Sequence, residues 1–85
     1  MLSKLEIREL ATRAADNVGC QLRDLRRARG IKIRTVSDAT GLSIDEIDRI
    51  ENWCMNIFNL ESVIKLAAFY DRRIYVDFCS LEDVV

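Results

Sequence analysis

Apolar residues recur with the period of a helix along the first third of the chain, from Leu5 through Val18 to Leu25. Ser3 and Glu6 precede this stripe at the spacing of a capping box, in which a hydroxyl and a carboxylate satisfy each other's free backbone N–H groups. The pattern predicts a helix over residues 3–18 that continues toward Arg29, with a candidate break at residues 17–19.

The same signals predict three more helices. Gly30 and Gly41 are natural helix stops and bracket a short helical segment. Ser43 and Glu46 form a second capping box, and Asn59 is a good N-cap. The expected helices cover residues 33–40, 44–52 and 60–70.

Residues 73–79 differ from everything before them, because β-branched and aromatic residues alternate there. That alternation favours a strand, and a lone strand cannot satisfy its own backbone groups. We therefore expect the strand to pair with its counterpart in a second chain. The residues expected at this dimer contact are Ile74, Tyr75, Val76 and Phe78. The predicted fold class is thus an all-α domain of four to five helices over residues 1–72, a C-terminal β-strand at 73–79 and a tail at 80–85.

Composition narrows the function classes. The chain has 85 residues, which suits a single domain, and 49% of them are hydrophobic, so a packed core is expected. No apolar run is long enough to span a bilayer, and the N-terminal residues lack the apolar stretch of a signal peptide, so a cytoplasmic protein without membrane contact is expected. Three widely spaced cysteines and the lack of histidine argue against a metal site, a cofactor or an enzyme.

Charge is distributed unevenly although the net charge is only −1. Residues 20–34 contain six basic residues and one acidic residue, whereas residues 37–51 contain five acidic residues and one basic residue. The basic block is suited to phosphate contacts, but it also fits an ordinary solvated helical face, and the sequence leaves both interpretations open.

Two short helices joined by a glycine-containing turn are typical of a helix-turn-helix. The segments that match a known pattern are residues 22–31 (Leu-Arg-Asp-Leu-Arg-Arg-Ala-Arg-Gly-Ile), 40–43 (Thr-Gly-Leu-Ser), 49–52 (Arg-Ile-Glu-Asn) and 60–67 (Leu-Glu-Ser-Val-Ile-Lys-Leu-Ala), with Val36 and Ile47 between them. In this register the chain resembles the Cro/repressor-type (XRE-like) helix-turn-helix transcriptional regulators over roughly residues 20–71. The resemblance implies a lambda-repressor-like fold that binds double-stranded DNA.

The resemblance also implies roles for particular residues. Arg26 in the first helix would pair with Glu51 at the end of the recognition helix and hold the two helices together. DNA contacts would fall at the start of the second helix and along the third, with the first-helix arginines on phosphates. The expected DNA-binding residues are Arg23, Arg27, Lys32, Ile33, Ser43, Ile44, Asp45, Arg49 and Asn52.

The leading hypothesis is a homodimeric regulator that binds an inverted-repeat operator, with recognition helices about one helical turn apart, ~34 Å. Four acids against one base in residues 43–52 motivate a rival from another class, since carboxylates are repelled by phosphates. The rival is a protein-interaction module, an antirepressor or antitoxin-like partner, that keeps the fold with weak or no DNA binding. Trp53 and the apolar residues up to Phe58 would either anchor such a partner or cover the edge of the core.

Overall fold

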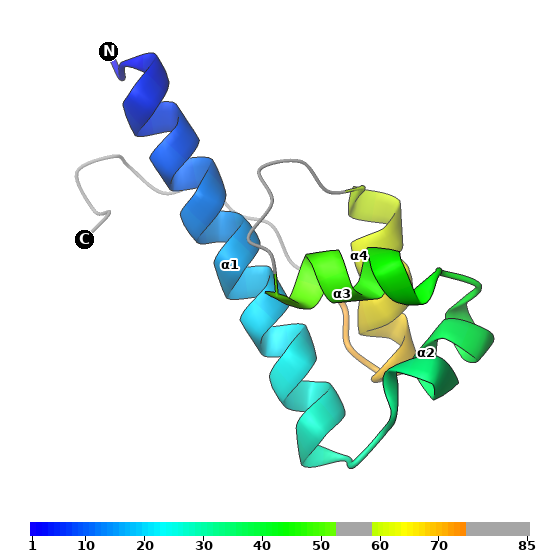
Figure 1. Cartoon of the computed structure of the whole chain (residues 1–85). Coiled ribbons are helices and arrows are strands. Elements are labelled where there is room, and N and C mark those ends of the chain that lie inside the picture. The colour runs from blue at the N-terminus through cyan, green and yellow to red at the C-terminus, as the bar shows by residue number, and fades with distance from the viewer. Residues whose placement is uncertain (53–58, 75–85) are drawn as a thin grey trace.

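The computed structural model describes residues 1–52 and 59–74, and over these residues the chain is all-helical (Figure 1). The helices are α1 (Lys4–Ala28), α2 (Ile33–Thr40), α3 (Ile44–Asn52) and α4 (Leu60–Phe69). The all-α class is confirmed, and so are the helices expected at 33–40 and 44–52. The Trp53–Phe58 segment lies outside the described residues.

Helix α1 is a single helix of 25 residues, so the candidate break at 17–19 was wrong. The capping box is present at its start, with both Ser3–Glu6 hydrogen bonds at 3.1 Å. Gly19 does not interrupt the helix. Its role is in the packing of α1 against α3. It is buried where α3 crosses α1, and a Cβ at this position would overlap the carbonyl oxygen of Ile50. Glycine here lets two helices approach closely.

The connection between α2 and α3 is short and depends on Gly41. Gly41 has a φ of +80°, in the left-handed region, and its N–H donates to the carbonyl of Ser37 at 2.9 Å. The Ser37 hydroxyl closes the turn from the other side by donating to the carbonyl of Leu42 at 2.5 Å. These bonds set the angle at which α3 leaves α2.

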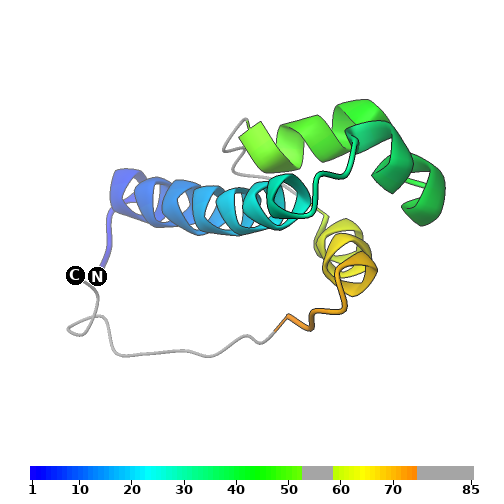
Figure 2. The same ribbon diagram turned by 90° about the horizontal axis from the view of Figure 1, so that it is seen from below.

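The core lies where the four helices meet. Its largest fully buried side chains are Tyr70, Ile47, Leu66, Val36 and Val63, drawn from α2, α3 and α4 and from the residue that follows α4. Leu22 supplies the contribution of α1. Seen from below, α3 and α4 lie on different sides of α1, with α2 beyond its C-terminal end (Figure 2).

The first three turns of α1 project beyond the other helices (Figures 1 and 2). No residue from 4 to 14 is buried, and the projection contributes to an elongated molecule of 43 × 22 × 20 Å. None of the described helices is long and apolar enough to cross a membrane.

The expected C-terminal strand falls mostly outside the described residues. Ile74 is described; it is not in a strand and instead packs, half-buried, against the core. Its expected role in a dimer strand is therefore not supported. Tyr75, Val76, Phe78 and the tail at 80–85 lie outside the described residues.

Candidate nucleic-acid interface

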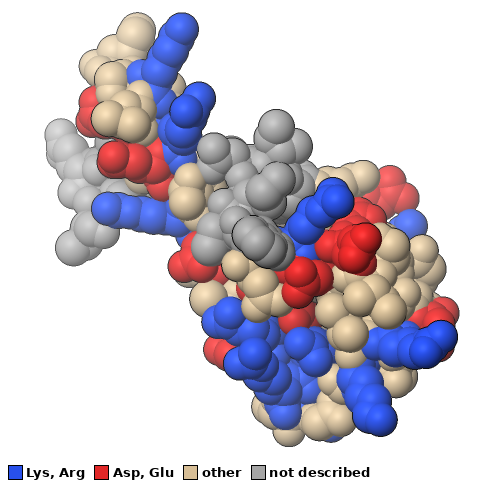
Figure 3. Space-filling model, in the orientation of Figure 1, with Lys and Arg blue, Asp and Glu red and all other residues tan. Residues whose placement is uncertain are grey.

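Positive and negative charge occupy neighbouring areas on the face that carries α3 (Figure 3). Basic side chains gather over the C-terminal end of α1 and over α2, and acidic side chains lie over α3. We define the basic ridge as Arg23 and Arg27 of α1, Lys32 before α2, and Arg34 of α2. Arg23 is half-buried and the other three are exposed. The ridge therefore offers three freely accessible cations beside α3.

The structure brings Arg26 and Glu51 together. The guanidinium donates to both carboxylate oxygens, with the Nε–Oε2 distance at 3.0 Å and the Nη2–Oε1 distance at 2.9 Å. Its Nη1 also donates to the carbonyl of Ile31 at 3.2 Å. The Glu51 side chain is only 1% exposed, and the hydrogen bond to it raises the pKa of Arg26 above its usual value. The pair fastens the end of α3 to α1 and to the α1–α2 connection.

Arg23 and Asn52, both expected to contact DNA, form a hydrogen bond with each other. Arg23 Nη1 donates to Asn52 Oδ1 at 3.3 Å, and Asn52 Nδ2 donates to Asp48 Oδ1 at 2.8 Å. Arg23 Nη2 also donates to the sulfur of Cys20 at 3.3 Å. This chain of polar contacts supports the α1–α3 joint and engages side chains that were expected to bind DNA.

Glu46 is turned toward α4. Its backbone N–H donates to the Ser43 hydroxyl at 3.1 Å, which is one half of the expected capping box. Its carboxylate accepts from the hydroxyl of Ser62 at 2.6 Å, and Ser62 is buried. Sequence reasoning missed Ser62, because nothing local signals a contact between residues sixteen positions apart.

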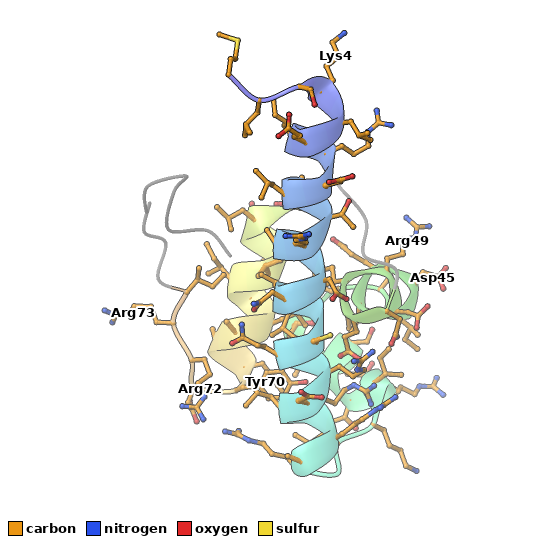
Figure 4. All side chains as sticks on the ribbon, turned by 90° about the vertical axis from the view of Figure 1, so that its left-hand side faces the viewer. Lys4, Asp45, Arg49, Tyr70, Arg72 and Arg73 are labelled. Carbon is orange, nitrogen blue, oxygen red and sulfur yellow. The ribbon has the colours of Figure 1, made fainter. Side chains whose placement is uncertain are left out.

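Few charges remain on the outer face of α3. Asp45 and Arg49 project from the side of this helix that is turned away from α1 (Figure 4). Ser43 is exposed and Ile44 is 42% exposed, so both are accessible at the start of α3. Glu51 is paired with Arg26, and the Glu46 carboxylate is directed to Ser62, so two of the four α3 carboxylates are turned away from the outer face.

Ile33, another residue expected to contact DNA, lies at the start of α2. Its side chain is half-buried and packs against the core. Lys32, one residue earlier, is exposed at the N-cap of α2. Lys32 is therefore the more accessible of the two side chains at this end of α2.

Comparisons with protein-family models, curated proteins and solved structures found no match to this chain.

In the part of the chain that the structure describes, no group of three or more histidine, cysteine or acidic residues is arranged to hold a metal ion. The α3 face carries accessible hydrogen-bond donors and cations, on α3 itself and on the basic ridge beside it. Such groups bind phosphates and base edges without covalent chemistry.

The opposite side of the molecule carries another basic area, beside α4. Arg72 and Arg73 lie there, on the far side of α1 from Asp45 and Arg49 (Figure 4). Arg29 stacks on the ring of Tyr70, with its guanidinium 5.7 Å from the ring centroid, and donates to the Tyr70 carbonyl at 3.2 Å. Burial raises the pKa of the Tyr70 hydroxyl, and this group has no hydrogen-bond partner among the described residues.

Proposed function

We propose that the chain is a homodimeric, sequence-specific DNA-binding transcriptional regulator. In this proposal α2, the 41–43 turn and α3 act as a helix-turn-helix, and α3 enters the major groove of an inverted-repeat operator. The observation that carries the proposal is the inward binding of Glu46 and Glu51, which removes two of the four α3 carboxylates from the outer face. The charge argument against DNA binding is weaker than the sequence suggests.

The accessible groups can be divided by the part of the duplex that they suit. Arg27, Lys32 and Arg34 carry exposed charge at the border of the interface, and we assign them to phosphates, which position a protein on DNA. Ser43 and Arg49 suit base edges, and the exposed Ile44 suits a thymine methyl group. Asp45 can accept a hydrogen bond from cytosine N4, so it would favour cytosine over the other bases at that position.

The test compares two arginines on opposite faces. Binding to fragments of the encoding genome is measured by fluorescence anisotropy at low salt for the parent chain, Arg49→Ala and Arg72→Ala. We expect Arg49→Ala to weaken binding by about tenfold or more, as for removal of a base contact, and Arg72→Ala to bind like the parent. Absence of binding by the parent chain, or equal effects of the two substitutions, contradicts the proposal.

The second candidate function is a protein-interaction module with weak or no DNA binding. It is favoured by the exposed Ile44 next to Asp45 at the start of α3, a combination of apolar and acidic groups that suits a basic protein surface. Affinity capture with the full chain separates the candidates. Operator binding together with the failure to retain any protein partner dismisses the interaction module.

A further inference from the structure

The first three turns of α1 project beyond the other helices, and none of the residues from 4 to 14 is buried (Figure 1). Helices this short are marginal in water, and most helices in proteins are stabilised by packing an apolar face. This projection starts with a complete capping box, yet it leaves large apolar side chains in water: Leu5 is 65% exposed and Ile7 is 55% exposed. The contacts among the described residues do not explain why these apolar side chains are exposed.

The apolar face of the projection has a definite direction. At about 100° per residue, Ile7, Leu10 and Ala14 fall on one side of the helix. Leu5 falls on nearly the opposite side, since two residues turn the helix by about 200°. Glu6 and Arg13 are seven residues apart, so they lie in one line along the same edge of the Ile7 face.

We propose that this face binds the same face of a second copy of the chain, with the two α1 projections antiparallel about a two-fold axis near residue 9. Ile7 of each copy then packs beside Leu10 of the partner subunit. The occupant follows from charge complementarity. Glu6 of one copy meets Arg13 of the partner subunit, and the symmetric contact repeats it.

Glu6 and Arg13 cannot form an ion pair with each other within one chain. Seven residues of helix separate them by about 10 Å, and Arg13 has no ion pair with a described residue. Parallel pairing would place Glu6 opposite Ala11 instead, because parallel helices pair edge residues five positions apart. Of the two arrangements, only the antiparallel one brings Glu6 of one copy to Arg13 of the partner subunit.

The antiparallel arrangement also determines where the two α3 helices of the dimer lie. The relevance of their positions to DNA rests on the proposed function. Gly19 lies against α3, and the other buried residues of α1, Ala15 and Leu22, share its side of the helix, roughly a right angle around α1 from the Ile7 face. The two-fold axis of an antiparallel pair is perpendicular to the plane of the two helices, so both α3 helices emerge on the same side. Gly19 is ten residues from the axis, which puts the two α3 crossings about 30 Å apart. Half-sites one turn apart need about 34 Å.

The first experiment measures self-association of the full chain by sedimentation equilibrium over a range of concentrations. We expect a dimer whose dissociation constant rises by about tenfold or more for Ile7→Glu and stays unchanged for Leu5→Glu. Both side chains are exposed, so neither substitution should alter the helix content, which circular dichroism checks. A monomeric parent chain, or equal behaviour of the two variants, overturns the proposal.

The second experiment tests the register with charge reversals. Arg13→Glu makes one edge all acidic and Glu6→Lys makes it all basic, so each variant alone should dimerise less well than the parent. An equal mixture of the two should recover association as a heterodimer. If the mixture associates no better than its components, the antiparallel register is overturned.

DNA binding provides a separate readout. A dimer that responds to Ile7→Glu as expected but fails to bind genomic fragments leaves the pairing intact and removes the proposed function. A chain that binds DNA specifically, but whose association is insensitive to Ile7→Glu, retains the proposed function and loses the α1 pairing.

Discussion

Arg26 and Glu51 are the clearest case of a single contact with a large structural effect. A buried carboxylate is stable only when it is paired and hydrogen-bonded, and Glu51 receives both from one planar guanidinium. The contact joins residues 25 positions apart, so it stabilises the arrangement of α1 and α3 rather than either helix.

Replacing Arg26 by Met should lower the free energy of unfolding by about 3 kcal/mol, because it leaves the Glu51 carboxylate buried without a partner. Urea unfolding of the parent and the variant measures the difference. Lys65→Met is the matched control, since Lys65 pairs with Glu61 at 3.7 Å on the surface and such pairs contribute little. Equal losses for the two variants would show that burial does not govern the Arg26–Glu51 pair.

Tyr70 makes stability depend on pH in the alkaline range. Burial raises the pKa of its hydroxyl above 10.0, so the unfolded chain releases the proton first as the pH rises. Stability should be unaffected by this group below about pH 10 and should fall above it. Tyr70→Phe should reduce that alkaline loss and leave neutral stability unchanged or slightly higher, because the hydroxyl has no partner among the described residues. Urea unfolding at about pH 8 and about pH 10.5, on either side of the ordinary tyrosine pKa, gives the comparison, and an unchanged alkaline slope in the variant contradicts it.

At the same scale, sequence predicted contacts unevenly. Arg26 and Glu51 were found through the register of a resemblance, whereas Glu46–Ser62 and Arg23–Asn52 were not, because these polar side chains meet through helix crossing. The half-buried position of Ile33 was not predicted either, since exposure depends on how α2 packs on the core.

Among the elements, α1 shows how one residue type can signal opposite outcomes. Glycine in a helix is usually interpreted as a weak point, yet at Gly19 the neighbouring helix occupies the space of a side chain. Local patterns predicted the helices and their caps well, because caps and periodicity involve residues three or four positions apart. Whether α1 breaks was a question of tertiary contact, which those patterns do not encode.

Gly19→Ala should destabilise the protein by about 1–3 kcal/mol, because the new methyl group forces α3 away from α1. The sign is diagnostic, since the same change in an unpacked helix stabilises by about 0.5–1 kcal/mol. Thermal unfolding followed by circular dichroism provides the measurement. A higher melting temperature for the variant would mean that α3 does not lie against Gly19.

At the scale of the whole molecule, net charge is a poor guide to what the chain can bind. The basic ridge and the Arg72–Arg73 area lie on different sides, so one duplex on the α3 face would sample only the first. A net charge of −1 therefore conceals a concentrated basic area beside α3 (Figure 3).

If the ridge binds phosphates, the affinity for DNA should fall steeply with salt. Arg27→Ala should then reduce the slope of log affinity against log salt by about two for the dimer, because each of its two subunits neutralises one phosphate fewer. Arg73→Ala, a charge on the other side, should leave the slope unchanged. Anisotropy titrations at several salt concentrations measure both slopes. Identical slopes for the parent and Arg27→Ala would remove the ridge from the interface.

Because α1 is a single unbroken helix, its length determines how far α3 lies from the first turns of α1. If two copies meet through its first turns and each carries α3 farther along, the number of residues between those points sets the spacing of the operators that the dimer can use. Inserting eleven residues after Ala14 would keep every face within about 20° of its present direction. It would lengthen each arm by about 16 Å and move the two α3 helices apart by about 33 Å, which is close to one further turn of DNA. Chains that differ only in this length would select operators of different half-site separation, with no change in the residues that read the bases.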